Sequence, residues 1–127
     1  MAVVRTMSQA INVELDEQDG NLIARFRLAQ NAFLTDQAYL QAFRDVKTSA
    51  EERGAAGGYD RMVLNLAEMA YIQSMAISGM LRLQSDLRKL GIELRLAELS
   101  DDVAKVLAIM NLDKHFSVFR TEKEALA

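Results

Sequence analysis

The sequence of 127 residues contains no cysteine and a single histidine. The absence of cysteine excludes disulfides, thiolate metal sites and a cysteine nucleophile. The single histidine, His115, excludes most Ser/His catalytic arrangements and most histidine-based zinc sites. It lies among charged residues in a predicted turn, and we interpret it as an ordinary loop residue. We therefore expect a protein that is not an enzyme and that uses no metal and no cofactor.

Long apolar runs and an excess of basic residues are also absent. No apolar stretch approaches the roughly 18 residues of a membrane span, and the first residues lack the apolar block of a signal peptide. The net charge of −3 differs from the basic surface that is typical of domains that bind duplex nucleic acid. These absences predict a soluble, cytoplasmic protein that neither inserts into a membrane nor binds nucleic acid.

The chain is rich in apolar side chains, which make up 50% of its residues. That share is sufficient for a sizeable core and too high for a disordered chain. The length falls within the usual range of about 50–250 residues for one domain, so we expect a single domain over residues 1–127. Residues 1–9 are predicted to form either an extra strand or a flexible arm.

The first half of the chain predicts an antiparallel hairpin. Apolar and polar residues alternate over 11–15 and again over 22–28, with the period of half-buried strands. Between these segments, Asp19-Gly20 is a strong signal for a tight hairpin turn.

A helix and a glycine-rich linker follow the hairpin. Thr35 or Asp36 can cap a helix that we expect to end near Glu52. The glycines of Gly54–Gly58 suggest a phosphate-binding loop, but no Lys-Ser/Thr pair follows them and the next predicted element is a strand. We interpret this segment as a flexible linker.

The second half begins with the pattern of a βαβ unit. Residues 62–66 predict a central strand that is buried on both faces. Residues 74–90 predict a helix that Gly91 ends, and residues 92–96 predict the next strand. This order indicates parallel strands with a right-handed crossover. The predicted buried stripe of the helix is Ile77, Met80, Leu81, Leu83, Leu87 and Leu90.

Shorter elements complete the chain. Ser100, followed by acidic residues, is typical of a helix start. A turn over 111–115, a strand over 116–119 and a helix over 121–126 follow. The sequence thus predicts an α/β fold: a mixed sheet of about five strands, with an N-terminal antiparallel hairpin and about four helices packed mainly on one face. The buried stripe of the helix that begins at Ser100 is predicted to be Val103, Val106, Leu107 and Met110.

Ser74 lies at the turn from the central strand to its helix. The first N–H groups of a helix have no partner within the helix, and together with the helix dipole they favour negative charge. The Ser74 hydroxyl could therefore cap the helix or accept a phosphoryl group, and the residues alone leave both open. Ser78 lies one turn further on the same face, either as a second candidate phosphoacceptor or as an ordinary helical serine.

From Met62 onward the sequence resembles the STAS domain, the fold of bacterial anti-sigma factor antagonists. Similar segments occur in the family's order, and the first half of the chain matches in its layout of hairpin, helix and linker. The resemblance implies a STAS-like single domain that acts by binding and not by catalysis. The segments are Val63-Leu-Asn-Leu66 for V-L-D-L, Tyr71-Ile-Gln-Ser-Met-Ala-Ile77 for F-I-D-S-S-G-L, Leu87-Arg-Lys-Leu-Gly91 for the helix end, and Leu112-Asp-Lys-His-Phe-Ser-Val-Phe119 for L-D-R-L-F-x-V-F.

The resemblance also implies a partner and a switch. Antagonists of this family dock on an anti-sigma factor that is also a serine kinase, and phosphorylation of the serine after the aspartate ends the docking. By position, Ser74 is that phosphoacceptor and the turn 71–80 is the docking surface, with contacts from Gln73, Ser74, Met75, Ala76 and Ile77. The sequence departs from the family by Gln73 for the aspartate, Met75 for the second serine and Ala76 for the glycine.

Other functions remain open beside this switch in bacterial signal transduction and transcription regulation. The chain could be a constitutive accessory subunit, similar to STAS proteins that bind the ATPase of an ABC transporter or a larger scaffold, without phosphorylation. Met75 suits such a permanent surface better than a second hydroxyl. A small-molecule or nucleotide sensor has little support, because no phosphate loop is visible. A homodimer could form through an apolar strand edge or through residues 1–9.

Overall fold

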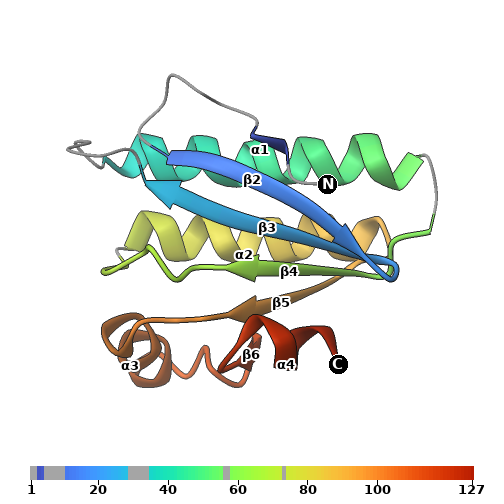
Figure 1. The fold of residues 1–127 in the computed structure, drawn as a ribbon. Helices are drawn as coiled ribbons and strands as arrows, with labels where there is room; N and C mark the ends of the chain where they lie inside the picture. The colour runs from blue at the N-terminus through green and yellow to red at the C-terminus, as the bar shows by residue number, and fades with distance from the viewer. Residues whose placement is uncertain (1–2, 5–10, 29–34, 56–57, 73) are drawn as a thin grey trace.

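A six-stranded mixed sheet forms the centre of the computed structural model (Figure 1). The structure describes residues 3–4, 11–28, 35–55, 58–72 and 74–127. The strands lie side by side in the order in which they occur in the chain. They are β1 Val3–Val4, β2 Ile11–Gln18, β3 Asn21–Leu28, β4 Arg61–Asn65, β5 Glu93–Ala97 and β6 Ser117–Phe119; the helices are α1 Asp36–Ala55, α2 Ser74–Lys89, α3 Asp101–Ile109 and α4 Glu122–Leu126.

The predicted antiparallel hairpin is present as β2 and β3. Gln18 pairs with Asn21, which leaves Asp19 and Gly20 as the two residues of the turn. Both have positive φ angles, 50° and 80°, as a type I′ turn requires. Within residues 1–9, Val3–Val4 form the short strand β1, which pairs antiparallel with β2; the other residues of this segment lie outside the described part.

The second half of the sheet is parallel. β3 pairs with β4, β4 with β5 and β5 with β6, all in parallel register. The strand β4 lies inside the sheet, and its residues Met62, Val63 and Leu64 are fully buried. The predicted central strand and the parallel β4–α2–β5 unit are thus confirmed.

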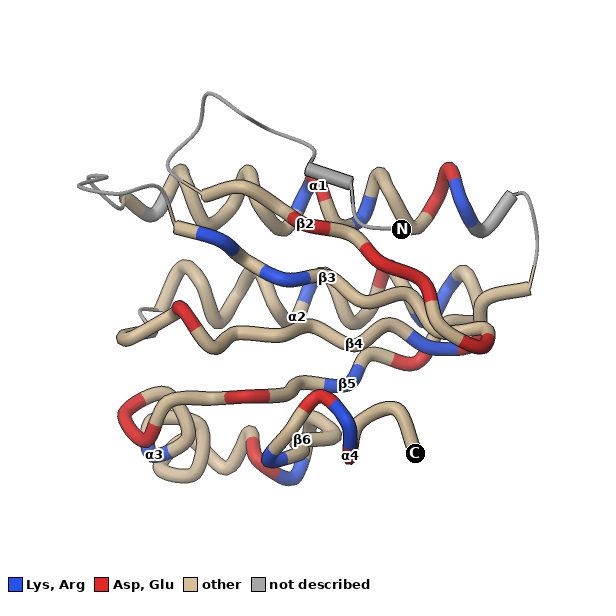
Figure 2. The backbone as a smooth tube through the Cα atoms, in the orientation of Figure 1, with Lys and Arg blue, Asp and Glu red and all other residues tan. Residues whose placement is uncertain are grey.

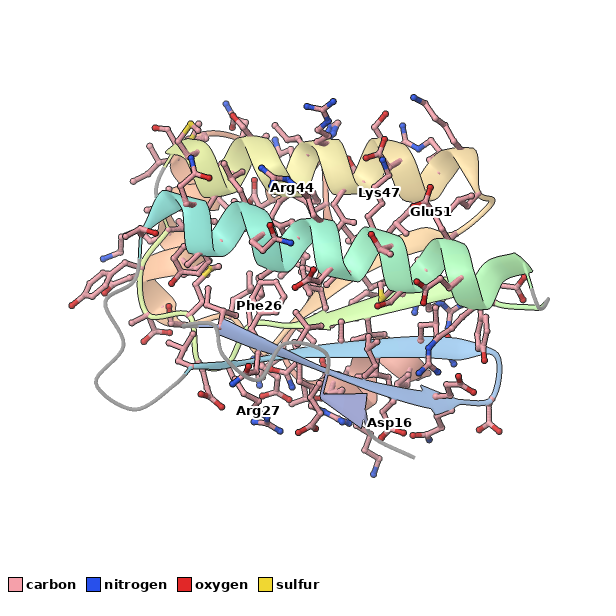
Figure 3. The ribbon with its side chains drawn as sticks, turned by 90° about the horizontal axis from the view of Figure 1, so that it is seen from above. Asp16, Phe26, Arg27, Arg44, Lys47 and Glu51 are labelled. Atoms are coloured by element: carbon pink, nitrogen blue, oxygen red, sulfur yellow. The ribbon has the colours of Figure 1, made fainter. Side chains whose placement is uncertain are left out.

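Helices α1 and α2 pack side by side on one face of the sheet, and the main hydrophobic core lies between these two layers (Figure 1). Phe26 of β3 points toward the helices, and its ring centroid lies 5.5 Å from that of Phe43 in α1 (Figure 3). Helix α3 contributes Val103 and Leu107 to the same core. The expected α/β fold with helices mainly on one face is confirmed.

Helix α4 packs against the opposite face of the sheet. Its Ala125 joins a smaller buried cluster with one residue from each of the three strands β3, β4 and β5. This face is therefore covered in part by the end of the described chain, while the large core lies on the other side. The cluster consists of Ile23, Val63, Ala97 and Ala125.

Three details differ from the sequence-based expectations. Helix α1 extends to Ala55, past the expected end near Glu52. Leu90 and Met110, expected on buried helical stripes, are 44% and 50% exposed. Both lie directly after the last residue of a helix, where the following residue turns the chain with a positive φ angle: Gly91 at 77° and Asn111 at 59°. The helical period therefore stops before it would have turned these side chains into the core.

Candidate functional site

The turn between β4 and α2 is held in place by its own backbone and by a buried methionine. The N–H of Leu66 donates to the carbonyl of Ala97 at 3.1 Å, and the N–H of Met69 donates to the carbonyl of Leu66 at 2.9 Å. The side chain of Met69 is fully buried in the main core. The turn is thus anchored where it leaves the sheet.

Contacts from two neighbouring elements support the same turn. On one side, Glu68 accepts a hydrogen bond from the N–H of Leu28 at 2.9 Å and forms an ion pair with Arg27 at 3.0 Å. On the other side, the Ser100 hydroxyl donates to the carbonyl of Ala70 at 3.1 Å, while it also accepts the N–H of Val103 as the N-cap of α3. A partner would therefore meet a preformed surface here.

Ser74 is the first residue of α2, and its side chain is exposed. Within the described residues, its hydroxyl has no hydrogen-bond partner, and the first turn of α2 carries no acidic side chain. The free N–H groups at this helix start and the dipole favour an added negative charge. The position is chemically suited to a phosphoryl group. Ser78 is exposed one turn further along the helix.

Two large apolar side chains close to Ser74 in the sequence are exposed. Tyr71 is 72% exposed and Met75 is 45% exposed. Tyr71 begins the predicted docking turn 71–80 but was not named among its contact residues, although an aromatic residue in a turn is a signal that sequence reasoning can use. The three exposed residues Tyr71, Ser74 and Met75 define what we call the turn surface.

The structure divides the predicted contact residues into two groups. Met75 and Ser74 are exposed, whereas Ala76 and Ile77 are 1% and 5% exposed. The side chains of Ala76 and Ile77 therefore offer little surface to a partner, and the exposed candidates are Ser74 and Met75. Gln73 lies outside the described residues.

A charged cluster that the sequence analysis missed lies on the sheet face opposite α1 and α2. Arg25 of β3 holds the carboxylate of Glu122 in α4 with two hydrogen bonds of 2.9 and 2.6 Å. It also pairs with Glu14 and Asp16 of β2 at 3.1 and 3.4 Å. Figure 2 shows the basic positions of β3 beside the acidic positions of β2, and in Figure 3 Asp16 and Arg27 lie on the side of the sheet away from the helices.

This cluster is structural in character. Asn65 donates a further hydrogen bond to Glu122 at 2.7 Å, so the carboxylate has three donors. Hydrogen bonds from Arg25 are the main cause that lowers the pKa of Glu122, against the opposing effect of burial. The same bonds raise the pKa of Arg25. Arg25 offsets part of the negative charge of the three carboxylates, and its hydrogen bonds to Glu122 fasten α4 to the sheet.

Neither a metal site nor a helix that could span a membrane occurs among the described residues. Among the residues that the structure describes, no group of three or more His, Asp or Glu side chains could hold a metal ion. None of the described helices is both long and apolar enough to cross a membrane. His115 is exposed and packs edge-on to Phe116, while its carbonyl accepts a hydrogen bond from Gln84 at 3.1 Å.

The sequence matches the model of a known protein family. The model of the STAS domain matches residues 12–125. The chain belongs to the STAS domain family. The resemblance that the sequence shows from Met62 onward is thus confirmed, and the match also covers the hairpin and α1 in the first half of the chain.

Solved structures of similar fold share little sequence with this STAS domain. The protein TM1081 of Thermotoga maritima is 20% identical, with 88% of this chain and 83% of that chain covered and a TM-score of 0.65. An anti-sigma factor antagonist from Mycobacterium paratuberculosis is 16% identical, with 96% of each chain covered and a TM-score of 0.65. A chain of the stressosome, a signal integration and transduction hub, is 13% identical to this chain. The match covers 88% of this chain and 91% of that chain, with a TM-score of 0.65. At these identities the likeness concerns the fold.

Proposed function

We propose that this STAS domain is a non-catalytic signalling module that docks on a protein partner through its turn surface. Its partner would be an anti-sigma factor that is also a serine kinase, and phosphorylation of Ser74 would end the docking. The observation that carries the proposal is the exposed Ser74 at the start of α2, between the exposed apolar side chains of Tyr71 and Met75. Membership of the STAS family and the antagonist of similar fold support it.

Phosphorylation of Ser74 should affect the fold of the domain and its binding to a partner in different ways. A phosphoserine adds almost two negative charges at about neutral pH. At the start of α2 these charges meet free N–H groups and the positive end of the dipole, so the domain keeps its fold. A partner packed on Tyr71 and Met75 meets the same charges at close range, in a contact that excludes water. Desolvation of the phosphate then opposes the complex.

The test uses three proteins: wild type, Ser74→Ala and Ser74→Glu. The cognate kinase with ATP should phosphorylate the wild type on Ser74, as mass spectrometry of the peptides covering 62–82 would show. Ser74→Ala should bind the kinase as wild type does. Ser74→Glu should bind at least about tenfold more weakly, a loss of about 1.4 kcal/mol, yet unfold in urea at the same concentration as wild type or a higher one.

A matched control shows that the position of the charge matters. Ser85→Glu adds the same charge to an exposed position of α2 away from the turn surface, and should leave binding unchanged. Equal binding by all three Ser74 proteins, with no phosphate on Ser74, would exclude the switch.

The exposed Met75 favours a second candidate function. A thioether on the surface beside Ser74 suits a permanent apolar contact. The domain would then be a constitutive accessory subunit of an ABC-transporter ATPase or of a larger scaffold. Co-purification of the ATPase with Ser74→Ala and Ser74→Glu to the same extent, together with its loss on Met75→Asp, would select this function over the switch.

A further inference from the structure

A groove of about 500 Å³ runs between α1 and α2 on the outer side of the helical layer. Its floor is apolar and includes Phe43, Gly79 and Leu83, and a Cβ added at Gly79 would lie 2.7 Å from the ring of Phe43. Phe43 and Leu83 are almost fully buried, and Leu40 is partly buried. The apolar surface that a ligand can contact is therefore supplied by Leu40 and by Met75, which also lines the groove and is 45% exposed.

The walls of the groove carry more basic than acidic side chains. Arg44 and Lys47 come from α1, and Arg82 and Asp86 come from α2. In the view of Figure 3, Arg44 and Lys47 lie along the side of α1 that faces α2. Three cations against one carboxylate is a local excess of positive charge in a chain whose net charge is −3.

Two of these cations are available to a ligand. Lys47 is paired with Asp86 at 3.5 Å. Arg44 is exposed and donates one hydrogen bond of 3.3 Å to Gln41. Arg82 is exposed, and within the described ranges neither arginine forms an ion pair. The guanidinium groups of two helices thus stand on opposite walls above an apolar floor.

We infer that this groove binds an acidic amphipathic segment of a partner protein. One apolar side chain of the segment packs on Leu40 and Met75, and carboxylates one helical turn away pair with Arg44 and Arg82. Arginine matches a carboxylate with two parallel hydrogen bonds, which fixes the orientation of the segment. The walls of the groove are basic although the chain as a whole is acidic, and this charge favours an acidic ligand.

The groove adjoins the turn surface, since Met75 lies on both. The inference therefore deepens the proposed function, because it states the chemistry of the partner that docks at this end of α2. It is tested at Arg44 and Arg82 with peptides, whereas the proposed function is tested at Ser74 with a kinase. Failure of either test leaves the other interpretable.

The experiment starts from random dodecapeptides displayed on phage. They are selected on the wild-type protein after depletion on the double variant Arg44→Glu/Arg82→Glu. The enriched peptides should contain Asp or Glu within one helical turn of a large apolar residue. Their synthetic forms, followed by fluorescence anisotropy, should bind wild type and lose affinity as ionic strength rises.

Single charge reversals locate the site. Arg44→Glu and Arg82→Glu should each lower the affinity of the protein for the peptide by about tenfold or more. Arg88→Glu is the matched control, because it reverses an exposed arginine of the same helix that does not line the groove, and should leave the affinity unchanged. Urea unfolding of each variant checks that the fold is retained.

Four results would overturn the inference. Enriched peptides without acidic residues, or peptides that bind all variants equally, would show that the arginines do not select the ligand. Binding of phosphatidylglycerol vesicles through both arginines, without enrichment of acidic peptides, would assign the groove to a membrane surface. Self-association that the double variant abolishes, again without peptide enrichment, would assign it to a second copy of the chain.

Discussion

Gly79 is predicted to be required for the packing of α2 on α1. A Cβ atom built at this position lies 2.7 Å from Cδ2 of Phe43 and 3.3 Å from Cδ2 of Leu40. Phe43 is 4% exposed, and its ring packs against Phe26, so it has little room to withdraw. The variant Gly79→Ala must therefore separate the helices or move the ring of Phe43 off its preferred rotamer.

Two opposing effects set the magnitude of this change. Alanine is favoured over glycine in a helix interior by about 0.8–1.0 kcal/mol. Overpacking a filled core typically costs about 1–3 kcal/mol. The expected net effect of Gly79→Ala is a loss of about 1 kcal/mol, which for a domain of this length lowers Tm by roughly 4 °C.

Equilibrium unfolding in urea, followed by circular dichroism, measures the effect in a double-mutant cycle. The smaller side chain in Phe43→Leu leaves room for the added methyl group. In that background Gly79→Ala should become stabilising by about 1 kcal/mol, which is a coupling energy of about 2 kcal/mol. Ser85→Ala, at an exposed position of the same helix, reports helix propensity alone. Equal stabilisation by Gly79→Ala in both backgrounds would refute the packing argument.

Two further predictions concern stability. Glu122→Gln should cost about 1–2 kcal/mol at neutral pH, because it weakens the charged hydrogen bonds to Arg25. Since folding lowers the pKa of Glu122, its contribution is full above the unfolded carboxyl pKa of about 4.3 and disappears as pH falls through the lower folded value. The urea midpoints of wild type and Glu122→Gln, compared across acidic pH, measure this contribution, and Glu124→Gln at an exposed position is the control. A difference in midpoint that persists below both the folded and the unfolded pKa of Glu122 would contradict the prediction. Gly91→Ala should lower the free energy of unfolding by about 1 kcal/mol through the positive φ alone, because no atom lies within 4 Å of the added Cβ. Gly91→Asn should lower it less. Unchanged urea midpoints for both variants would exclude backbone strain at this position.

Features that depend on neighbouring residues could be predicted from the sequence. The alternation of strands β2 and β3 and their Asp-Gly turn depend on short-range patterns, and so do the helix start at Ser100 and the stop at Gly91. In each case the decisive contact joins residues a few positions apart. Ile77 also belongs to this class: the apolar stripe that predicts α2 includes it, so helical periodicity favours its burial over partner contact.

Features that join distant segments could not be predicted in this way. The pair Arg25 and Glu122 is 97 residues apart in the sequence, and no local pattern links an arginine in a hairpin to a glutamate in the last described helix. The close approach of Gly79 to Phe43, and with it the groove, depends on how two helices cross. The exposure of Tyr71 depends on the path of the turn after β4.

The order of the strands in the sheet has a consequence for the way in which this domain forms. Each strand from β2 to β6 pairs with the strand that precedes it in the chain, so a growing polypeptide can add strands one after another without inserting any between existing partners. The β2–β3 hairpin closes a loop of two residues and forms most readily, whereas each parallel pair must first close a crossover that contains a helix. Helix α4 is the exception, because its carboxylate at Glu122 must find Arg25 on a strand made much earlier. Its attachment therefore comes after the hairpin and the parallel strands against which it packs are in place.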